Sequence, residues 1–137
     1  MRGAETYLSG RVGPFALLMA TRLVRHVRVV DDWTATAGQM DILDLRRLFG
    51  TEALPRRSLV SLTGEDEKER VIALDCVGSL HAMDDSQFLP LPSAFRYAST
   101  VFDAVCSQPI EGIYGLRVRC RPTFVPMHND AHRIGSG

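Results

Sequence analysis

The side chains that could perform chemistry are sparse in this sequence, and the clearest group lies near its C-terminus. His128 and His132 are four residues apart in the segment HNDAH, with Asp130 between them. On a helix, two histidines at this spacing share a face and could bind a metal ion. However, Pro126 precedes them, no glutamate follows the first histidine, and the chain soon ends in Gly-Ser-Gly. A flexible tail explains this segment more simply, so we expect no metal site.

Two neighbouring carboxylates and a histidine form the other candidate for chemistry. Asp84 and Asp85 could act as general acid and general base, and His81 lies three residues before the first of them. The same two aspartates, followed by a serine, are also typical of the N-cap of a helical turn. We favour the cap and keep an acid–base site as the alternative. We expect His26 and His81 to be partly buried structural residues.

Other signatures of catalysis are missing from the sequence. The glycines form neither the GxGxxG pattern of a dinucleotide site nor a phosphate-binding P-loop. A nucleophile-elbow motif is absent around the candidate serines, which are Ser9, Ser58 and Ser79. We therefore expect a protein that is not an enzyme and that uses no cofactor.

Length and composition are those of an ordinary globular protein. The 137 residues fit one domain, and 45% of them are apolar and 23% charged. The formal net charge is zero, which argues against a general nucleic-acid binder and against electrostatic attachment to a membrane. We assign residues 1–120 to a single domain. Residues 121–137 form an irregular tail, because Pro122 and Pro126 break the region.

The cysteines and the N-terminus indicate a reducing compartment. Three cysteines with wide spacing and no CxxC pair, Cys76, Cys106 and Cys120, predict reduced and buried thiols. The first residues, MRGAETYLSG, do not have the pattern of a signal peptide. The longest apolar run, residues 15–20, is far too short to span a bilayer. We expect a cytoplasmic protein without direct membrane insertion.

Short apolar or alternating runs, separated by turn signals, predict a mainly β chain. Residues 21–30 predict one or two helical turns that lead into a strand. The stretch MDILDLRRLFG, residues 40–50, predicts a strand and then a helical turn that Gly50 ends. The other expected strands cover residues 7–12, 15–19, 57–63, 70–75, 77–83, 101–107 and 113–119, with Gly78 as a bulge. Turns at this spacing favour a barrel or a sandwich.

Four of these segments resemble, in order and spacing, the CheW family of chemotaxis coupling proteins. They are GPFALLMATRLVRHV (13–27), ILDLRRLFG (42–50), VIALDCVGSLHAMDDSQFLPLP (71–92) and residues 102–119. The resemblance implies two small β-barrels around a shared core. It also implies a non-enzymatic adaptor that links a CheA-type histidine kinase and the cytoplasmic tip of a chemoreceptor in a membrane-associated array.

The sequence also departs from the family pattern. Only residues 33–41 fill the place where the family has a longer, strand-containing connection, so one strand and a partner-contacting arginine are missing. A barrel that lacks a strand has an unpaired edge. We expect a loop, a second copy of the chain in a homodimer, or a strand from a partner to cover that edge. Trp33, in this connection, either fills the core or anchors a partner.

Arginines and the strand end at residues 42–47 are the expected contacts for a partner. Arg46 and Arg47 either pair with Asp44 or project into an interface, and Arg22, Arg25 and Arg28 form either a solvated face or a basic strip. The full set of expected partner-binding residues is Arg22, Arg25, Trp33, Ile42, Asp44, Arg46 and Arg47.

Two other functions remain open at this point. One is a reduced CheW-like domain that serves for localisation in an array or for self-association. The other is a small β-barrel sensor, which would need an apolar cavity with a few polar groups.

Overall fold

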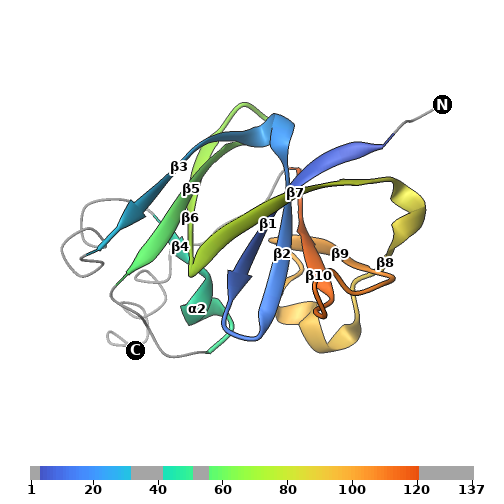
Figure 1. The fold of residues 1–137 in the computed structure, drawn as a ribbon. Helices are drawn as coiled ribbons and strands as arrows, with labels where there is room; N and C mark the ends of the chain where they lie inside the picture. Colours follow the sequence, from blue (N-terminus) through green and yellow to red (C-terminus); the bar gives the residue numbers. More distant parts are fainter. Residues whose placement is uncertain (1–3, 32–41, 51–55, 121–137) are drawn as a thin grey trace.

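The computed structural model describes residues 4–31, 42–50 and 56–120, and its elements are mostly short strands (Figure 1). The first half contains β1 (Glu5–Val12), β2 (Phe15–Ala20), the 3-10 turn η1 (Thr21–Leu23), β3 (Val24–Val30), β4 (Ile42–Asp44), α2 (Leu45–Leu48) and β5 (Arg57–Thr63). The second half contains β6 (Glu69–Leu74), β7 (Cys76–Met83), η2 (Asp85–Gln87), β8 (Phe88–Pro90), η3 (Ser93–Ala98), β9 (Phe102–Cys106) and β10 (Gly115–Val118). The fold is therefore mainly β, as the sequence predicted.

The first sheet has six strands in the order β7-β1-β2-β10-β9-β8. β1 and β2 form an antiparallel hairpin whose turn contains Gly13 at a φ of 56°, a conformation that glycine adopts without strain. β10 then pairs in parallel with β2, so the C-terminal hairpin extends the sheet that the N-terminal hairpin begins. Figure 1 shows this sheet curling on the right-hand side of the molecule.

β7 contains the bulge that the sequence predicted. Leu8 pairs with Leu80, but Gly10 pairs with Val77, so Gly78 and Ser79 together oppose Ser9 alone. The Ser9 hydroxyl donates to the Ser79 carbonyl and accepts from the Ser79 N–H, both at 3.1 Å. A side chain at the glycine would collide with that hydroxyl, which explains why glycine occupies the bulge.

The second sheet has four strands in the order β3-β5-β6-β4. β5 and β6 form the predicted hairpin, β3 adds to it in antiparallel fashion, and β4 pairs in parallel with β6. In the described part of the chain β3 and β4 are the two edges of this sheet. The connection of residues 33–41, from which an open edge was expected, lies outside the described residues.

The turn after β4 forms where the sequence predicted it. The Asp44 side chain accepts a hydrogen bond from the Arg46 N–H at 3.1 Å and so caps α2. Gly50 has a φ of 72°, and its N–H donates to the Arg47 carbonyl at 3.2 Å. This left-handed glycine is the helix stop expected from the motif.

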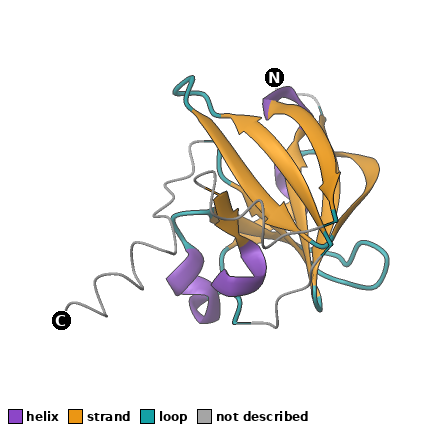
Figure 2. Cartoon of the chain, turned by 90° about the vertical axis from the view of Figure 1, so that its left-hand side faces the viewer, coloured by secondary structure: helices purple, strands orange, loops and turns teal. Residues whose placement is uncertain are grey.

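One apolar core joins the two sheets. It combines residues of the first sheet, such as Leu17 and Met19, with residues of the second, such as Val60 and Leu74. β1 approaches β6 closely at Gly10, where a Cβ atom would collide with the Leu74 side chain. Figure 2 shows helical segments below the strands and another helical segment at the opposite end of the molecule, near the N-terminus.

The segment after β2 forms as the sequence predicted, because Thr21–Leu23 is a helical turn and Val24–Val30 is a strand. The expectation of a partly buried His26 was wrong. His26 is exposed on that strand, whereas His81 is partly buried as expected. The expected tail, residues 121–137, and its two histidines lie outside the described residues.

The joint between the sheets gives the first prediction. Leu74→Ala removes a fully buried side chain from the shared core, so the free energy of unfolding should fall by about 2–5 kcal/mol. Leu89→Ala is the matched control, because Leu89 is half exposed, and it should change stability by less than about 1 kcal/mol. Urea unfolding measures both variants. Equal losses would show that Leu74 does not hold the sheets together.

Candidate functional site

β3 presents a row of exposed apolar and basic side chains at the edge of the second sheet. Arg25, His26, Val27, Arg28 and Val29 are all exposed, and Val29 exposes 52% of its surface. Val27 and Val29 are neighbours on one face of the strand and lie among basic side chains. This composition makes the strand a candidate contact surface.

The two faces of β3 differ in character. Val27 and Val29 oppose Val60 and Ser58. Val60 belongs to the shared core. Val27 and Val29 therefore lie on the face of the second sheet that packs on this core, beyond its edge. On the other face, His26 and Arg28 border a shallow cleft of about 120 Å³, which is also lined by Leu59, Ser61, Glu69 and Val71.

Arg46 does not project into solvent. Its guanidinium group binds the Asp75 carboxylate in a bidentate pair, with distances of 2.5 Å and 2.6 Å, and only 13% of its side chain is exposed. The Oδ2 atom of this carboxylate, which accepts from Arg46 Nη2, also accepts a hydrogen bond from the Gly13 N–H at 2.8 Å. Burial raises the pKa of Asp75, but the hydrogen bonds from Arg46 and Gly13 outweigh it and leave the pKa below its usual value.

Asp44 pairs with neither neighbouring arginine. Its carboxylate binds the guanidinium group of Arg57, at 2.5 Å and 3.3 Å, and the Arg57 side chain is completely buried. The sequence left two alternatives, in which Arg46 and Arg47 either pair with Asp44 or project into an interface, and the structure contradicts the first. The strand order explains the difference. β4 and β5 lie on opposite sides of β6, and Arg57, at the start of β5, reaches across to Asp44 at the end of β4.

The expected partner-binding residues therefore fall into different environments. Arg25 and Arg47 are exposed, Ile42 is half-buried, and Asp44 and Arg46 belong to ion pairs inside the molecule. Trp33 lies outside the described residues. That any of them contacts a partner stays a prediction.

Arg22 holds three segments together at the edge of the first sheet. Its guanidinium group binds the carboxylates of Glu5 and Glu65 and donates to the Cys120 sulfur at 3.2 Å. About 45% of the side chain remains exposed. Since Glu5 begins β1 and Glu65 follows β5, this arginine connects the two sheets and does not form a free basic strip.

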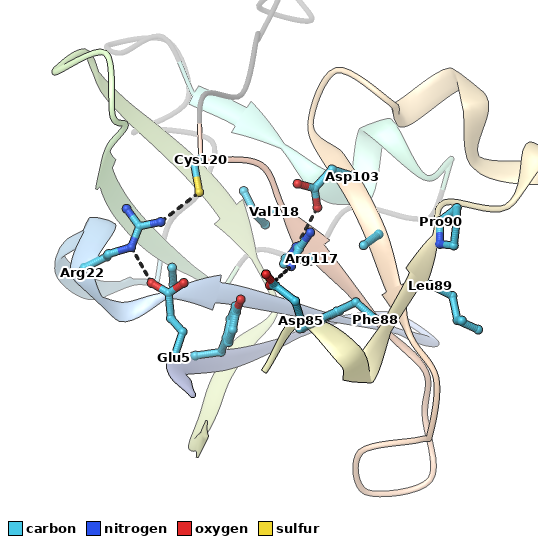
Figure 3. Close-up of a pocket in the computed structure, with 13 residues that line it drawn as sticks. Glu5, Arg22, Asp85, Phe88, Leu89, Pro90, Asp103, Arg117, Val118 and Cys120 are labelled. Carbon is cyan, nitrogen blue, oxygen red and sulfur yellow. Dashed lines mark hydrogen bonds and ion pairs between the residues drawn. The ribbon is translucent and has the colours of Figure 1, made fainter. Parts of the chain in front are cut away.

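A cavity of about 420 Å³ opens beside this arginine, inside the curl of the first sheet (Figure 3). Arg117 lies at its centre. The guanidinium group binds Asp103 at 2.8 Å and Asp85 at 3.5 Å, and it stacks on the Phe88 ring at 4.5 Å. Burial raises the pKa of the nearby Tyr7, although its hydrogen bond with Arg117 opposes the shift.

The lining of this cavity combines apolar side chains, such as Leu89 and Val118, with charged ones. Glu5 and Asp103 each bind one of its two arginines, Arg22 and Arg117, so these charges are paired within the protein. The sensor alternative, which needs an apolar cavity with a few polar groups, stays a prediction. Sequence reasoning missed Arg117 and Asp103, because only the pairing of β9 with β10 brings them together.

The candidate acid–base residues are also engaged in local structure. Asp84 and Gln87 form a capping box around η2, as the cap interpretation predicted. Asp85 points to Arg117, and His81 Nε2 lies 3.2 Å from the Ser79 hydroxyl. Among residues 4–31, 42–50 and 56–120, no group of three His, Cys, Asp or Glu side chains could hold a metal ion.

The cysteines are free thiols with different exposure. Cys106 is buried as predicted, and burial raises the pKa of its thiol. Cys76, at the start of β7, is exposed, so the expectation of buried thiols was wrong for this residue. Within the described ranges, no helix is both long and apolar enough to cross a membrane.

Comparison with solved structures identifies a similar fold. The chain matches the crystal structure of the scaffolding protein TtCheW from Thermoanaerobacter tengcongensis with a TM-score of 0.64 and 10% sequence identity, over 85% of this chain and 89% of the other. No protein-family model matches the sequence. No curated protein matches it either. The chain therefore has a CheW-like fold of two sheets around one core.

The buried ion pair gives a second prediction. Asp44→Asn keeps the cap oxygen but removes the charge that compensates the buried Arg57. The free energy of unfolding should fall by about 3–5 kcal/mol. Arg56→Gln is the control, since its pair with Asp31 spans 3.7 Å and is largely exposed. It should cost less than about 1 kcal/mol. Similar losses in urea unfolding would contradict a special role for Asp44.

The lowered pKa of Asp75 gives a third prediction, on pH. An aspartate with a lowered native pKa stabilises the fold above its unfolded pKa of about 4. This contribution should disappear as the pH falls through the native pKa. Asp75→Asn should therefore lower stability at pH 7, with a gap to the parent protein that narrows in acid. Thermal unfolding from pH 7 to pH 2 tests this, with Asp31→Asn as an exposed control. A gap independent of pH would rule out titration of Asp75 as the cause.

Proposed function

We propose that the protein is a non-enzymatic adaptor of chemotaxis-type signalling, which links a CheA-type histidine kinase, chemoreceptors, or both. The observation that carries this proposal is the CheW-like fold, matched over most of the chain to a protein described as a scaffold. The four sequence segments that resemble the CheW family agree with the proposal, although no family model matches the sequence. In this proposal residues 1–120 act as one cytoplasmic unit that is recruited to membrane-associated arrays.

The distribution of charge agrees with an adaptor. Asp44, Arg46 and Arg57 stabilise the protein itself, so they are poor candidates for recognition. Arg47 lies on the exposed side of α2, and Arg25 lies on the exposed strand β3. Arginine beside apolar side chains is a common composition for the centre of an interface. We therefore place the kinase or receptor contacts at these two residues first.

A second candidate function is array localisation through self-association. The observation that favours it is the open second sheet, in which β3 and β4 are edges within the described part of the chain. An open edge offers main-chain hydrogen bonds to another chain. A protein that uses this edge to bind a copy of itself would not need a kinase contact.

A binding experiment gives the fourth prediction and separates the two functions. The purified protein is mixed with a CheA-type kinase from the same organism, and then with a receptor cytoplasmic fragment, and analysed by size-exclusion chromatography with light scattering. We expect co-elution that Arg47→Glu weakens at least tenfold, because the substitution reverses a charge on the proposed surface.

The control variant is Lys68→Glu, which reverses an exposed charge at the tip of the β5–β6 hairpin. It should co-elute like the parent protein. If neither kinase nor receptor co-elutes and the protein elutes as a dimer, self-association replaces coupling. If the protein stays monomeric and binds neither, the adaptor proposal fails.

A further inference from the structure

Inside the curl of the first sheet, a β-bulge brings a carboxylate into the cavity of about 420 Å³. Arg117 pairs with Ala104 and Val118 pairs with Phe102, so Asp103 is the extra residue of β9. A bulge turns a side chain away from the regular alternation of its strand. Asp103 lines the cavity and binds Arg117 there at 2.8 Å (Figure 3). The irregular register therefore adds a negative charge to the lining.

The charged groups that line this cavity do not cancel. They are the carboxylates of Glu5, Asp85 and Asp103 and the guanidinium groups of Arg22 and Arg117. Three carboxylates against two guanidinium groups leave an excess of one negative charge at neutral pH. Arg22 also binds Glu65, which lies outside the lining and reduces the positive potential further. A cleft with an excess of one sign of charge concentrates ligands of the opposite sign, so the lining favours a cation.

The hydrogen-bonding groups favour the same kind of ligand. All three nitrogens of the Arg22 guanidinium group already donate to groups of the protein. Arg117 donates from Nε to Asp103 and from Nη1 to Asp85. By contrast, Glu5 and Asp103 each bind an arginine through one carboxylate oxygen, and a carboxylate can accept several hydrogen bonds. The cavity therefore has more to offer a donor than an acceptor.

Apolar groups form the rest of the lining. Phe88 and Pro90 of β8 border the cavity from one side, and Val118 of β10 borders it as well. The Tyr7 ring, also in the lining, lies 5.5 Å from the Phe88 ring. A pocket of a few hundred Å³ with apolar walls and a few polar groups suits a small organic molecule. The ligand should therefore combine a positive charge with an apolar body.

We propose that this cavity binds a small organic amine, whose ammonium group donates hydrogen bonds to the carboxylates of the lining, in particular Asp103, and whose apolar body lies against Phe88, Pro90 and Val118. Only 28% of the Asp103 side chain is exposed, and charge-assisted hydrogen bonds are stronger than neutral ones. The inference goes beyond the proposed adaptor function, because it gives the same domain a ligand site that requires neither kinase nor receptor.

Three compounds of similar size and different charge give the fifth prediction. The probes are phenethylamine, phenethyl alcohol and hydrocinnamate, which are positive, neutral and negative at neutral pH. Binding is followed by amide chemical shifts of the isotope-labelled full chain. We expect the amine to shift amides of β8, β9 and β10 and to bind at least tenfold more tightly than the alcohol, because only the amine forms charge-assisted hydrogen bonds. Hydrocinnamate should cause no shifts there.

Substitution of the carboxylates tests the site itself. Asp103→Asn keeps the size of the side chain and an oxygen for Arg117 but removes the charge, so it should weaken binding of phenethylamine at least tenfold. Glu5→Gln should also weaken it, and this variant retains Glu65 as a partner of Arg22, so it serves if Asp103→Asn does not fold. The control is Glu111→Gln, which removes an exposed carboxylate outside the lining and should leave binding unchanged.

Each contrary result has a separate meaning. Tighter binding of hydrocinnamate than of phenethylamine would overturn the proposal in favour of an anion site at the two arginines. Equal binding of the amine and the alcohol would overturn it in favour of an uncharged apolar pocket. A loss in Glu111→Gln equal to that in Asp103→Asn would show that overall charge, and not the cavity, attracts the amine. If no compound shifts amides around the cavity, the inference also fails. Co-elution with the kinase involves no amine, so the adaptor proposal is tested separately.

Discussion

The carboxylate of Asp44 is the constraint on which much of the structure depends. It neutralises a completely buried guanidinium group, Arg57, and at the same time caps α2. A buried charge without its partner is far more costly than a broken ion pair on the surface. Asp44 is the last residue of β4, and α2 begins at the next residue. The ion pair between the Asp44 side chain and Arg57 of β5 therefore fixes the position of the short helical turn.

The helical turn α2 also links the two sheets. With α2 held in place, Arg46 reaches Asp75, whose carboxylate also accepts the N–H of Gly13 in the β1–β2 hairpin. The Asp75 N–H donates to the Arg11 carbonyl at 2.9 Å in the same hairpin. A chain of charged groups thus runs from the second sheet to the first, alongside the apolar contact between Gly10 and Leu74. Together with the shared core, these contacts join the two sheets into one frame.

Much of this frame could be predicted from the sequence, because it depends on local patterns. Alternation predicted most strands, the glycine predicted the bulge at Gly78, and the motif ILDLRRLFG predicted β4, α2 and the stop at Gly50. The ion pairs could not be predicted, because they depend on strand order. Nothing local indicates that Asp44 meets Arg57 and not Arg46, or that Arg117 meets Asp103 within the curl of the first sheet.

Fold and recognition draw on different residues in this protein. A fold shared at 10% identity requires the same pattern of buried positions but leaves almost every exposed side chain free to differ. The charges of Asp44 and Arg46 are paired inside the protein. A substitution at either residue would therefore weaken the fold itself. Arg25, Val27 and Val29 are exposed, so they can change at little cost to the frame. Under the proposed adaptor function, partner choice would depend on exposed residues of this chain and not on the fold that it shares.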